Sequence, residues 1–189
     1  MTRTGGTRSL LVFAALAVVG LAGASTVALA AARGAFDRQG AAPSGQCSAP
    51  DLAGTVVDVT LTNMGGEMMR AGAMGGTMRV FSDRSSVPEG TLSLRVANTG
   101  SLVHELVVLR LADGQRVGER AVGSDNRVDE TGSVGEASRT CGPGSGDGID
   151  SGALGWVTLN LAPGRYELLC NLAGHYAAGM YTGVTVQAH

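Results

Sequence analysis

The sequence predicts an all-β domain of the sandwich or barrel class. Short stretches in which apolar and polar residues alternate recur along the chain, and this period of two is typical of half-buried strands. Glycine and proline turns separate these stretches, and helical periodicity is almost absent. With 30 glycines among 189 residues, and apolar residues at 44%, the chain favours strands and loops around a core. We expect about seven short strands from this pattern, which is enough for two packed sheets.

The first strands follow directly from the alternation. Residues 55–62 (TVVDVTLT) place Val57, Val59 and Leu61 on one face. Residues 78–81 form a shorter candidate, and residues 87–90 read as a turn. Residues 91–96 alternate again, with Ser93 and Arg95 on the outward face, and a turn follows at residues 98–100. Residues 105–111 are almost continuously apolar, as expected for a strand that is buried on both faces.

The pattern then breaks down between residues 112 and 155. Gly, Ser, Asp and Arg dominate this stretch, with one short helical turn expected near residues 129–137. An irregular insertion of this length is too long for a simple connector. Strand patterns return at residues 156–161, 165–170 and 181–186, with a turn at residues 162–164.

The N-terminus has the pattern of a targeting segment. Arg3 and Arg8 precede an uncharged, Leu-, Val- and Ala-rich stretch from residue 9 to residue 32. Residues 1–30 are therefore expected to be a signal peptide with cleavage after Ala30, or alternatively an uncleaved membrane anchor, since the stretch can span a bilayer of about 30 Å. Residues 31–54 read as a linker before a domain at residues 55–189. Either reading places that domain outside the cytoplasm, whether secreted, periplasmic or anchored on the outer face of the membrane.

The charges exclude one class of partner. All 14 basic residues are arginine, the net charge is −2, and no basic block occurs. A protein that binds nucleic acid through phosphate contacts is not expected from this composition.

The residues with the most specific spacing lie near the C-terminus. Residues 170–180 (CNLAGHYAAGM) contain Cys170, His175 and Met180, with four residues between each pair, and His104 begins a strand far upstream. Each of these residues alone is most often an ordinary core or polar residue. Together, two imidazoles, a thiolate and a weak axial thioether are the donors of a trigonal blue-copper site. A structural zinc site fits less well, because methionine is a poor zinc ligand.

At these residues the sequence resembles the cupredoxins, the small blue copper proteins. The loop spacing is similar to that of azurin, rusticyanin and sulfocyanin, and the pairing of NLAGHYAAGMY with NTGSLVHELVVL most resembles the sulfocyanin-like branch. The resemblance covers roughly residues 55–186. It implies a Greek-key β-sandwich of about eight strands, and one type 1 copper ion bound by His104, Cys170, His175 and Met180. Glu105 departs from the family pattern, since many relatives carry Asn or Ser after the first ligand.

The resemblance also implies a function. We expect an exported, monomeric, mononuclear copper protein that carries single electrons between transient protein redox partners. The alternative is a copper-binding protein for copper storage, delivery or resistance. An enzyme is disfavoured, because protein donors fill all the expected copper positions and leave none open for a substrate.

Two further groups of sulfur-containing residues remain. Once Cys170 is assigned to the metal, Cys47 and Cys141 can form a disulfide outside the cytoplasm, or else remain as two unpaired thiols. Five methionines fall within fifteen residues and could bind Cu(I), or could simply reflect the biased composition of a hairpin loop; they are Met64, Met68, Met69, Met74 and Met78.

The loop around His175 is uncharged from residue 171 to residue 181. We expect the outer edge of the His175 ring to reach solvent, and His104 to be buried because it starts an apolar strand. Leu172 and the small residues Ala173, Ala177 and Ala178 would then form a flat docking face for redox partners, or could equally serve packing.

Overall fold

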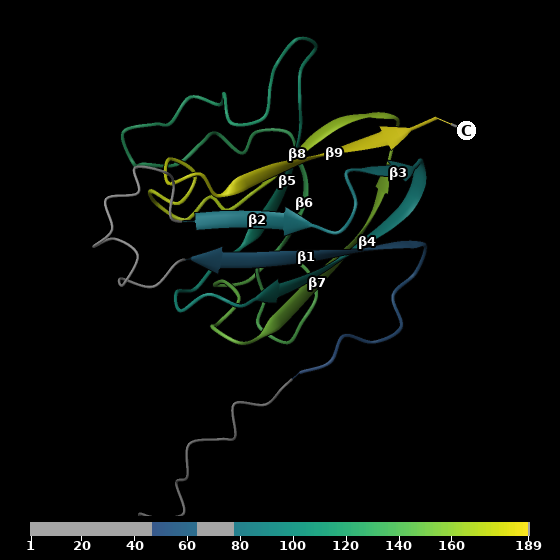
Figure 1. Cartoon of the computed structure of the whole chain (residues 1–189), viewed down its shortest axis with the longest axis horizontal. Coiled ribbons are helices and arrows are strands. Elements are labelled where there is room, and N and C mark those ends of the chain that lie inside the picture. The colour runs from purple at the N-terminus through teal and green to yellow at the C-terminus, as the bar shows by residue number, and fades with distance from the viewer. Residues whose placement is uncertain (1–46, 64–77, 189) are drawn as a thin grey trace, which may run out of the picture. The chain divides into compact units, whose positions relative to one another are not determined.

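The computed structural model describes residues 47–63 and 78–188, and within them nine strands form two sheets (Figure 1). No α-helix occurs in these residues. The predicted all-β class and the two-layer sandwich are confirmed, with one strand more than the eight expected. In chain order the strands are β1 (Thr55–Asn63), β2 (Met78–Ser82), β3 (Ser86–Pro88), β4 (Gly90–Asn98), β5 (Leu106–Arg110), β6 (Ser133–Ala137), β7 (Leu154–Leu161), β8 (Gly164–Leu169) and β9 (Tyr181–Gln187).

Both sheets are mixed. The first has the order β2-β1-β4-β7 and the second has the order β3-β9-β8-β5-β6. The pairs β1–β4 and β3–β9 are parallel, and the other pairs are antiparallel. The chain passes from the first sheet to the second between β4 and β5, and His104 lies on this crossing. β5 and β8 are neighbours, so the start of β5 and the end of β8 meet at the same end of the second sheet.

The apolar residues that alternate in the sequence form the inner face of the first sheet. Val57, Val59 and Leu61 of β1 are at most 1% exposed and pack in the core that the two sheets share. On β4, Ser93 lies on the outward face as predicted, but it is fully buried there. Its hydroxyl donates to the carbonyl of Ala53 at 2.7 Å and bonds to the Thr158 hydroxyl at 2.8 Å. The chain before β1 therefore covers the outer face of β4 at this point.

The insertion contains structure that the sequence pattern does not reveal. The helical turn expected near residues 129–137 is wrong, because Ser133–Ala137 form the edge strand β6, antiparallel to β5. Gly132 and Gly135 have φ angles of 84° and 149°, which lie outside the helical region. The pairing gives β5 a second neighbour, so that β5 is an inner strand of its sheet. The short strand β3 also lies where only a turn was expected, at the edge of the second sheet.

The Cys47–Cys141 disulfide is present, which confirms that expectation. The bond joins the segment before β1 to the insertion. The expected signal peptide or anchor (1–30), most of the linker (31–54) and the methionine stretch up to Met74 lie outside the described residues, whereas Met78 opens β2. None of the described residues forms a helix long and apolar enough to cross a membrane.

The disulfide should stabilise the fold, because it closes a loop across a sequence separation of 94 residues in the unfolded chain. We expect the double replacement Cys47→Ala/Cys141→Ala to lower the free energy of unfolding by about 2–4 kcal/mol, measured by urea denaturation. Reduction of the wild-type protein by a dithiol should reproduce the loss. Free alkylation of both cysteines without prior reduction would contradict the expectation.

Candidate metal centre

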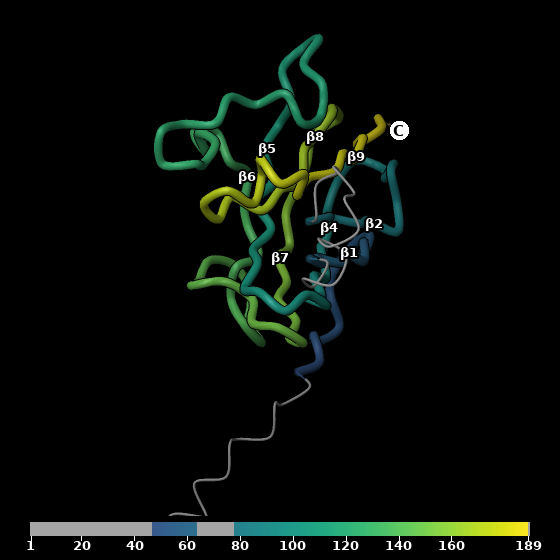
Figure 2. The backbone as a smooth tube through the Cα atoms, turned by 60° about the vertical axis from the view of Figure 1, so that its left-hand side comes forward, coloured from purple at the N-terminus to yellow at the C-terminus, as the bar shows by residue number. Residues whose placement is uncertain are grey.

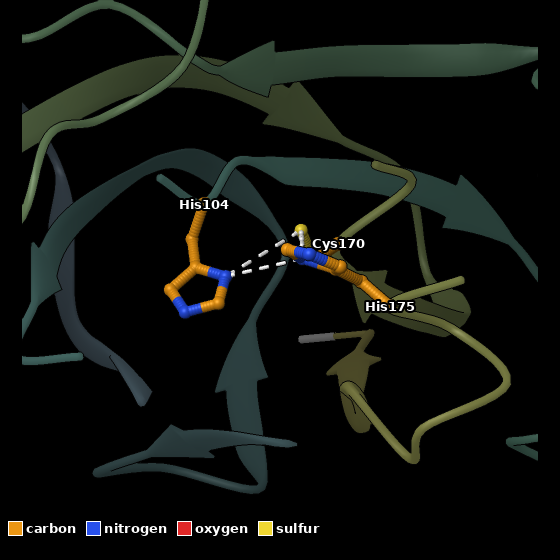
Figure 3. Close-up of side chains that lie close together, drawn as sticks. All are labelled: His104, Cys170 and His175. Atoms are coloured by element: carbon orange, nitrogen blue, oxygen red, sulfur yellow. Dashed lines mark hydrogen bonds between the residues drawn. The ribbon is translucent and has the colours of Figure 1, made fainter. Parts of the chain in front are cut away.

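Three side chains with metal-binding atoms converge at one end of the sandwich (Figure 3). Nδ1 of His104 lies 3.2 Å from Nδ1 of His175, and Sγ of Cys170 lies 3.2 Å from the same His175 atom. The third pair, Sγ of Cys170 and Nδ1 of His104, is separated by 4.0 Å. The two rings meet edge to face, with their centroids 5.0 Å apart. Two distant stretches of the chain, one with His104 and one with Cys170 and His175, thus direct one sulfur and two nitrogens at a common point.

This arrangement fits one small ion. Thiolate and imidazole ligands bind a first-row metal at about 2.0–2.3 Å, so ligand atoms sharing one ion lie about 3–4 Å apart. The three measured separations fall in this range. A soft sulfur with two imidazoles suits copper in both of its common oxidation states. By distance and by donor chemistry, the residues present therefore fit a copper ion.

Cys170 follows β8 directly and is fully buried. The backbone N–H of Glu105 points at its Sγ at 3.5 Å. Burial raises the pKa of the thiol to about 12, with the backbone N–H groups of Glu105 and Leu172 acting in the opposite direction. In the metal-free protein the sulfur is therefore protonated at neutral pH, and a metal must displace that proton to bind the thiolate.

His104 is held through its backbone and its ring. An isolated bridge joins it to Ile149 of the insertion, with N–H to O distances of 3.2 and 2.7 Å. Its ring nitrogen Nε2 lies 3.0 Å from Oδ1 of Asn63 at the end of β1. The residue is completely buried, and this burial lowers the pKa of its imidazole to about 4. The ring is thus neutral at neutral pH, as a metal ligand must be.

His175 and Met180 belong to a compact loop that closes on itself. The N–H of Met180 donates to the His175 carbonyl at 3.2 Å, and the N–H of Cys170 donates to the Met180 carbonyl at 3.0 Å. Met180 is fully buried in the same core cluster as Cys170. His175 is only partly buried, whereas His104 is fully buried, as the sequence predicts. Desolvation lowers the pKa of His175 as well.

The insertion lies beside this loop and supports it (Figure 2). The sequence pattern does not predict this support. The N–H of Gly174 donates to the carbonyl of Asn126 at 2.8 Å. The Tyr176 hydroxyl accepts the N–H of Arg120 and donates to Glu167, each at 3.0 Å. Glu167 is fully buried on β8 and forms an ion pair with Arg120 at 2.6 Å. Glu167 is the one acid in residues 165–170, and it is the sequence signal that could have indicated this network.

Glu105 directly follows His104, at the position where this sequence departs from the cupredoxin pattern that it resembles. Its Oε1 accepts the N–H of Asn171 at 3.2 Å, and the Asn171 side chain donates to Glu130 at 2.6 Å. Asn171 also exchanges hydrogen bonds of 2.7 and 3.0 Å with the backbone of Val128. Burial, and the nearby carboxylates of Glu130 and Glu136, raise the pKa of Glu105. The side chain after the first ligand thus ties the two ligand-bearing segments together.

Comparisons with known proteins add a family. Residues 54–189 match the model of the sulfocyanin (SoxE) domain, and no curated protein matches the chain. Similar solved structures include auracyanin from Roseiflexus castenholzii, with 23% identity, 71% of this chain and 98% of that chain covered, and a TM-score of 0.43. Rusticyanin from Thiobacillus ferrooxidans has 19% identity, coverages of 71% and 79%, and a TM-score of 0.43. An azurin from Methylomonas sp. strain J has 18% identity, coverages of 72% and 99%, and a TM-score of 0.41.

The buried, neutral His104 predicts a pH dependence for the metal-free protein. Its pKa is about 4 in the fold and near 6.5 in the unfolded chain, so between these values the unfolded chain binds more protons. The free energy of unfolding should therefore decrease as the pH falls through this window. Urea denaturation at several pH values tests this, with His104→Gln as the control that removes the group. Parallel pH curves for the two proteins would contradict it.

Proposed function

The chain belongs to the sulfocyanin (SoxE) domain family of the cupredoxins, and on this premise we propose that it is an exported, mononuclear blue-copper protein that carries single electrons. The observation that carries the proposal is the convergence of Cys170, His104 and His175 within the matched residues. We assign these three residues and Met180 as the ligands of one type 1 copper ion. The buried Met180 is the axial donor in this assignment.

A copper ion in this site supplies a one-electron couple, Cu(II)/Cu(I). The protein supplies a donor set acceptable to both states, with a thiolate and a thioether for Cu(I) and two imidazoles for either. His104 and Cys170 are fully buried, so water has little access to the ligand atoms. Hydrogen bonds from the loop to the Asn126 carbonyl and the Glu167 carboxylate, and one from the Arg120 N–H to the loop, hold the ligand loop in place. Ligands held in this way move little between oxidation states, which favours fast electron transfer.

His175 is the ligand through which an electron would pass between the copper ion and a redox partner. It is the only one of the three clustered residues that is not fully buried, and Ala173 and Ala177 beside it are exposed. We propose that this face, whose loop residues 171–181 carry no charge, receives the redox partners in short-lived complexes. A small, flat contact suits an encounter that must dissociate after each transfer. We further propose that the protein acts as a monomer and does not bind nucleic acid.

The disulfide supports an extracytoplasmic location, since such bonds persist in oxidising compartments. We propose secretion, export to the periplasm or anchoring on the outer face of the membrane through the N-terminal segment. The alternative function, copper storage or delivery, depends on the methionine stretch that lies largely outside the described residues. Stopped-flow electron transfer with a measurement of bound copper separates the two functions, because a carrier retains its copper through repeated oxidation and reduction.

The Cu(II) protein should absorb intensely in the visible region, because charge moves from the Cys170 thiolate to the metal. We expect Cys170→Ser to abolish this band. The variant Cys47→Ala/Cys141→Ala is the matched control and should keep the band, because those sulfurs form the disulfide. A Cys170→Ser protein of equal colour would refute the ligand assignment.

Met180 should set the reduction potential as a weak axial donor. Met180→Gln introduces a harder oxygen donor that favours Cu(II), so we expect a lower potential than in the wild type. Met180→Leu removes the donor and should raise the potential. Voltammetry on both variants measures the order, and identical potentials would show that Met180 is not axial.

A charge on the proposed docking face should slow electron exchange without altering the copper site. We expect Ala177→Glu to leave the visible spectrum unchanged and to lower the self-exchange rate measured by NMR line broadening in mixed-valence samples. Ala162→Glu is the matched control, because this exposed alanine lies in the turn before β8, at the opposite end of that strand from Cys170. An unaltered rate in Ala177→Glu, with a slower rate in the control, would show that the face is misplaced.

A further inference from the structure

Asn63, the last residue of β1, lies directly behind the His104 ring. We propose that Asn63 is a positioning residue that fixes the tautomer of His104, so that Nε2 carries the proton and Nδ1 presents its lone pair to the metal. The assignment of the metal as copper rests on the proposed function, whereas the tautomer itself does not.

The orientation of the Asn63 amide follows from its other contacts. Its Oδ1 accepts the backbone N–H of Ser101 at 2.9 Å and that of Leu102 at 3.2 Å. Backbone N–H groups can only donate, so an oxygen and not an NH₂ group must face them. On the opposite side, Nδ2 donates to the Ser101 hydroxyl at 2.9 Å. A flipped amide would place the two N–H bonds of the NH₂ group against the backbone N–H groups of Ser101 and Leu102, which rules out the other orientation.

The tautomer of His104 follows from this orientation. Nε2 lies 3.0 Å from Oδ1 of Asn63, and an oxygen with no hydrogen can only accept. Nε2 must therefore carry the proton, and in a neutral ring Nδ1 is then left with a free lone pair. Figure 3 shows the Nδ1 edge of the ring turned toward Cys170 and His175, and the other ring nitrogen turned away from them. Without an acceptor behind Nε2, the two tautomers would be closer in energy.

Gly100, in the turn after β4, leaves room for the contact between Asn63 and His104 because it has no side chain. A Cβ atom added to Gly100 would overlap Oδ1 of Asn63 and would come within 3.0 Å of Nε2 of His104. Asn98 holds the same turn from the other side, since its Oδ1 accepts the Gly100 N–H at 2.9 Å and its Nδ2 donates to the Leu102 carbonyl at 2.7 Å. The turn is thus built so that the Asn63 amide and the His104 ring can meet.

The direct test is NMR of the copper-free full chain labelled with ¹⁵N in histidine. We expect His104 in the wild type to be protonated at Nε2, with slow exchange of this proton with solvent. Asn63→Ala should speed that exchange and populate the second tautomer. Ser101→Ala, which removes only the bond from Nδ2 of Asn63, is the matched control and should keep the wild-type tautomer. A wild-type ring protonated at Nδ1, or an unchanged ring in Asn63→Ala, would overturn the proposal.

Two substitutions separate positioning of the ring from simple support of the turn. Asn63→Asp keeps an acceptor for the ring and for both backbone N–H groups, so it should keep the tautomer. Its negative charge should strengthen the imidazole as a donor and lower the reduction potential. Asn63→Leu removes the acceptor, and we expect copper affinity to fall about 10–100-fold.

If Asn63 only supports the turn, Asn63→Asp should have both the stability and the reduction potential of the wild type. That outcome would overturn the proposal. Asn160→Leu, at an exposed position on β7, controls for the loss of an asparagine and should change neither the tautomer nor copper affinity. If copper fails to bind the wild type while its His104 remains protonated at Nε2, the proposed function fails and the tautomer assignment stands.

Discussion

Burying two imidazoles and a thiol against one another removes their polar atoms from water, and the surrounding structure compensates for that cost. His104 and Cys170 are both fully buried, and desolvation shifts the pKa of each group toward its neutral form. Each has a hydrogen-bond partner away from the common point, the Asn63 amide for the ring and the Glu105 N–H for the sulfur. No buried side-chain nitrogen or oxygen in the described residues lacks a partner.

The insertion is part of this compensation. It contributes β6 to the second sheet, Ile149 to the backbone of His104, and Asn126 and Arg120 to the loop that carries His175. The disulfide through Cys141 and the buried Arg120–Glu167 ion pair attach the insertion to the body of the domain. A long stretch that is low in apolar residues therefore serves as a scaffold, held by hydrogen bonds, one disulfide and a few buried apolar residues such as Ile149 and Ala137.

Alternation of apolar residues in β1 and β4 predicts these strands well, because a sheet with one buried face imposes a period of two. The spacing within residues 170–180 likewise predicts which donors meet, because they lie close together in the chain. β6 has no such pattern, as it is a glycine-containing edge strand. Contacts such as His104–Asn63 and Arg120–Glu167 join residues 41 and 47 positions apart, and only the packed sheets bring these residues together.

Three of the four proposed ligands lie within eleven consecutive residues, while His104 reaches the site only through the packed fold. An unfolded chain keeps the three local donors together at little cost in loop-closure entropy. A metal bound to such a chain also stabilises the unfolded state, and this subtracts from the stabilisation that binding gives the native state. The net gain from metal binding is then determined largely by the fourth donor and by the burial of the site. We expect a chain that refolds in the presence of the metal to bind it first through the three local donors, with His104 joining last.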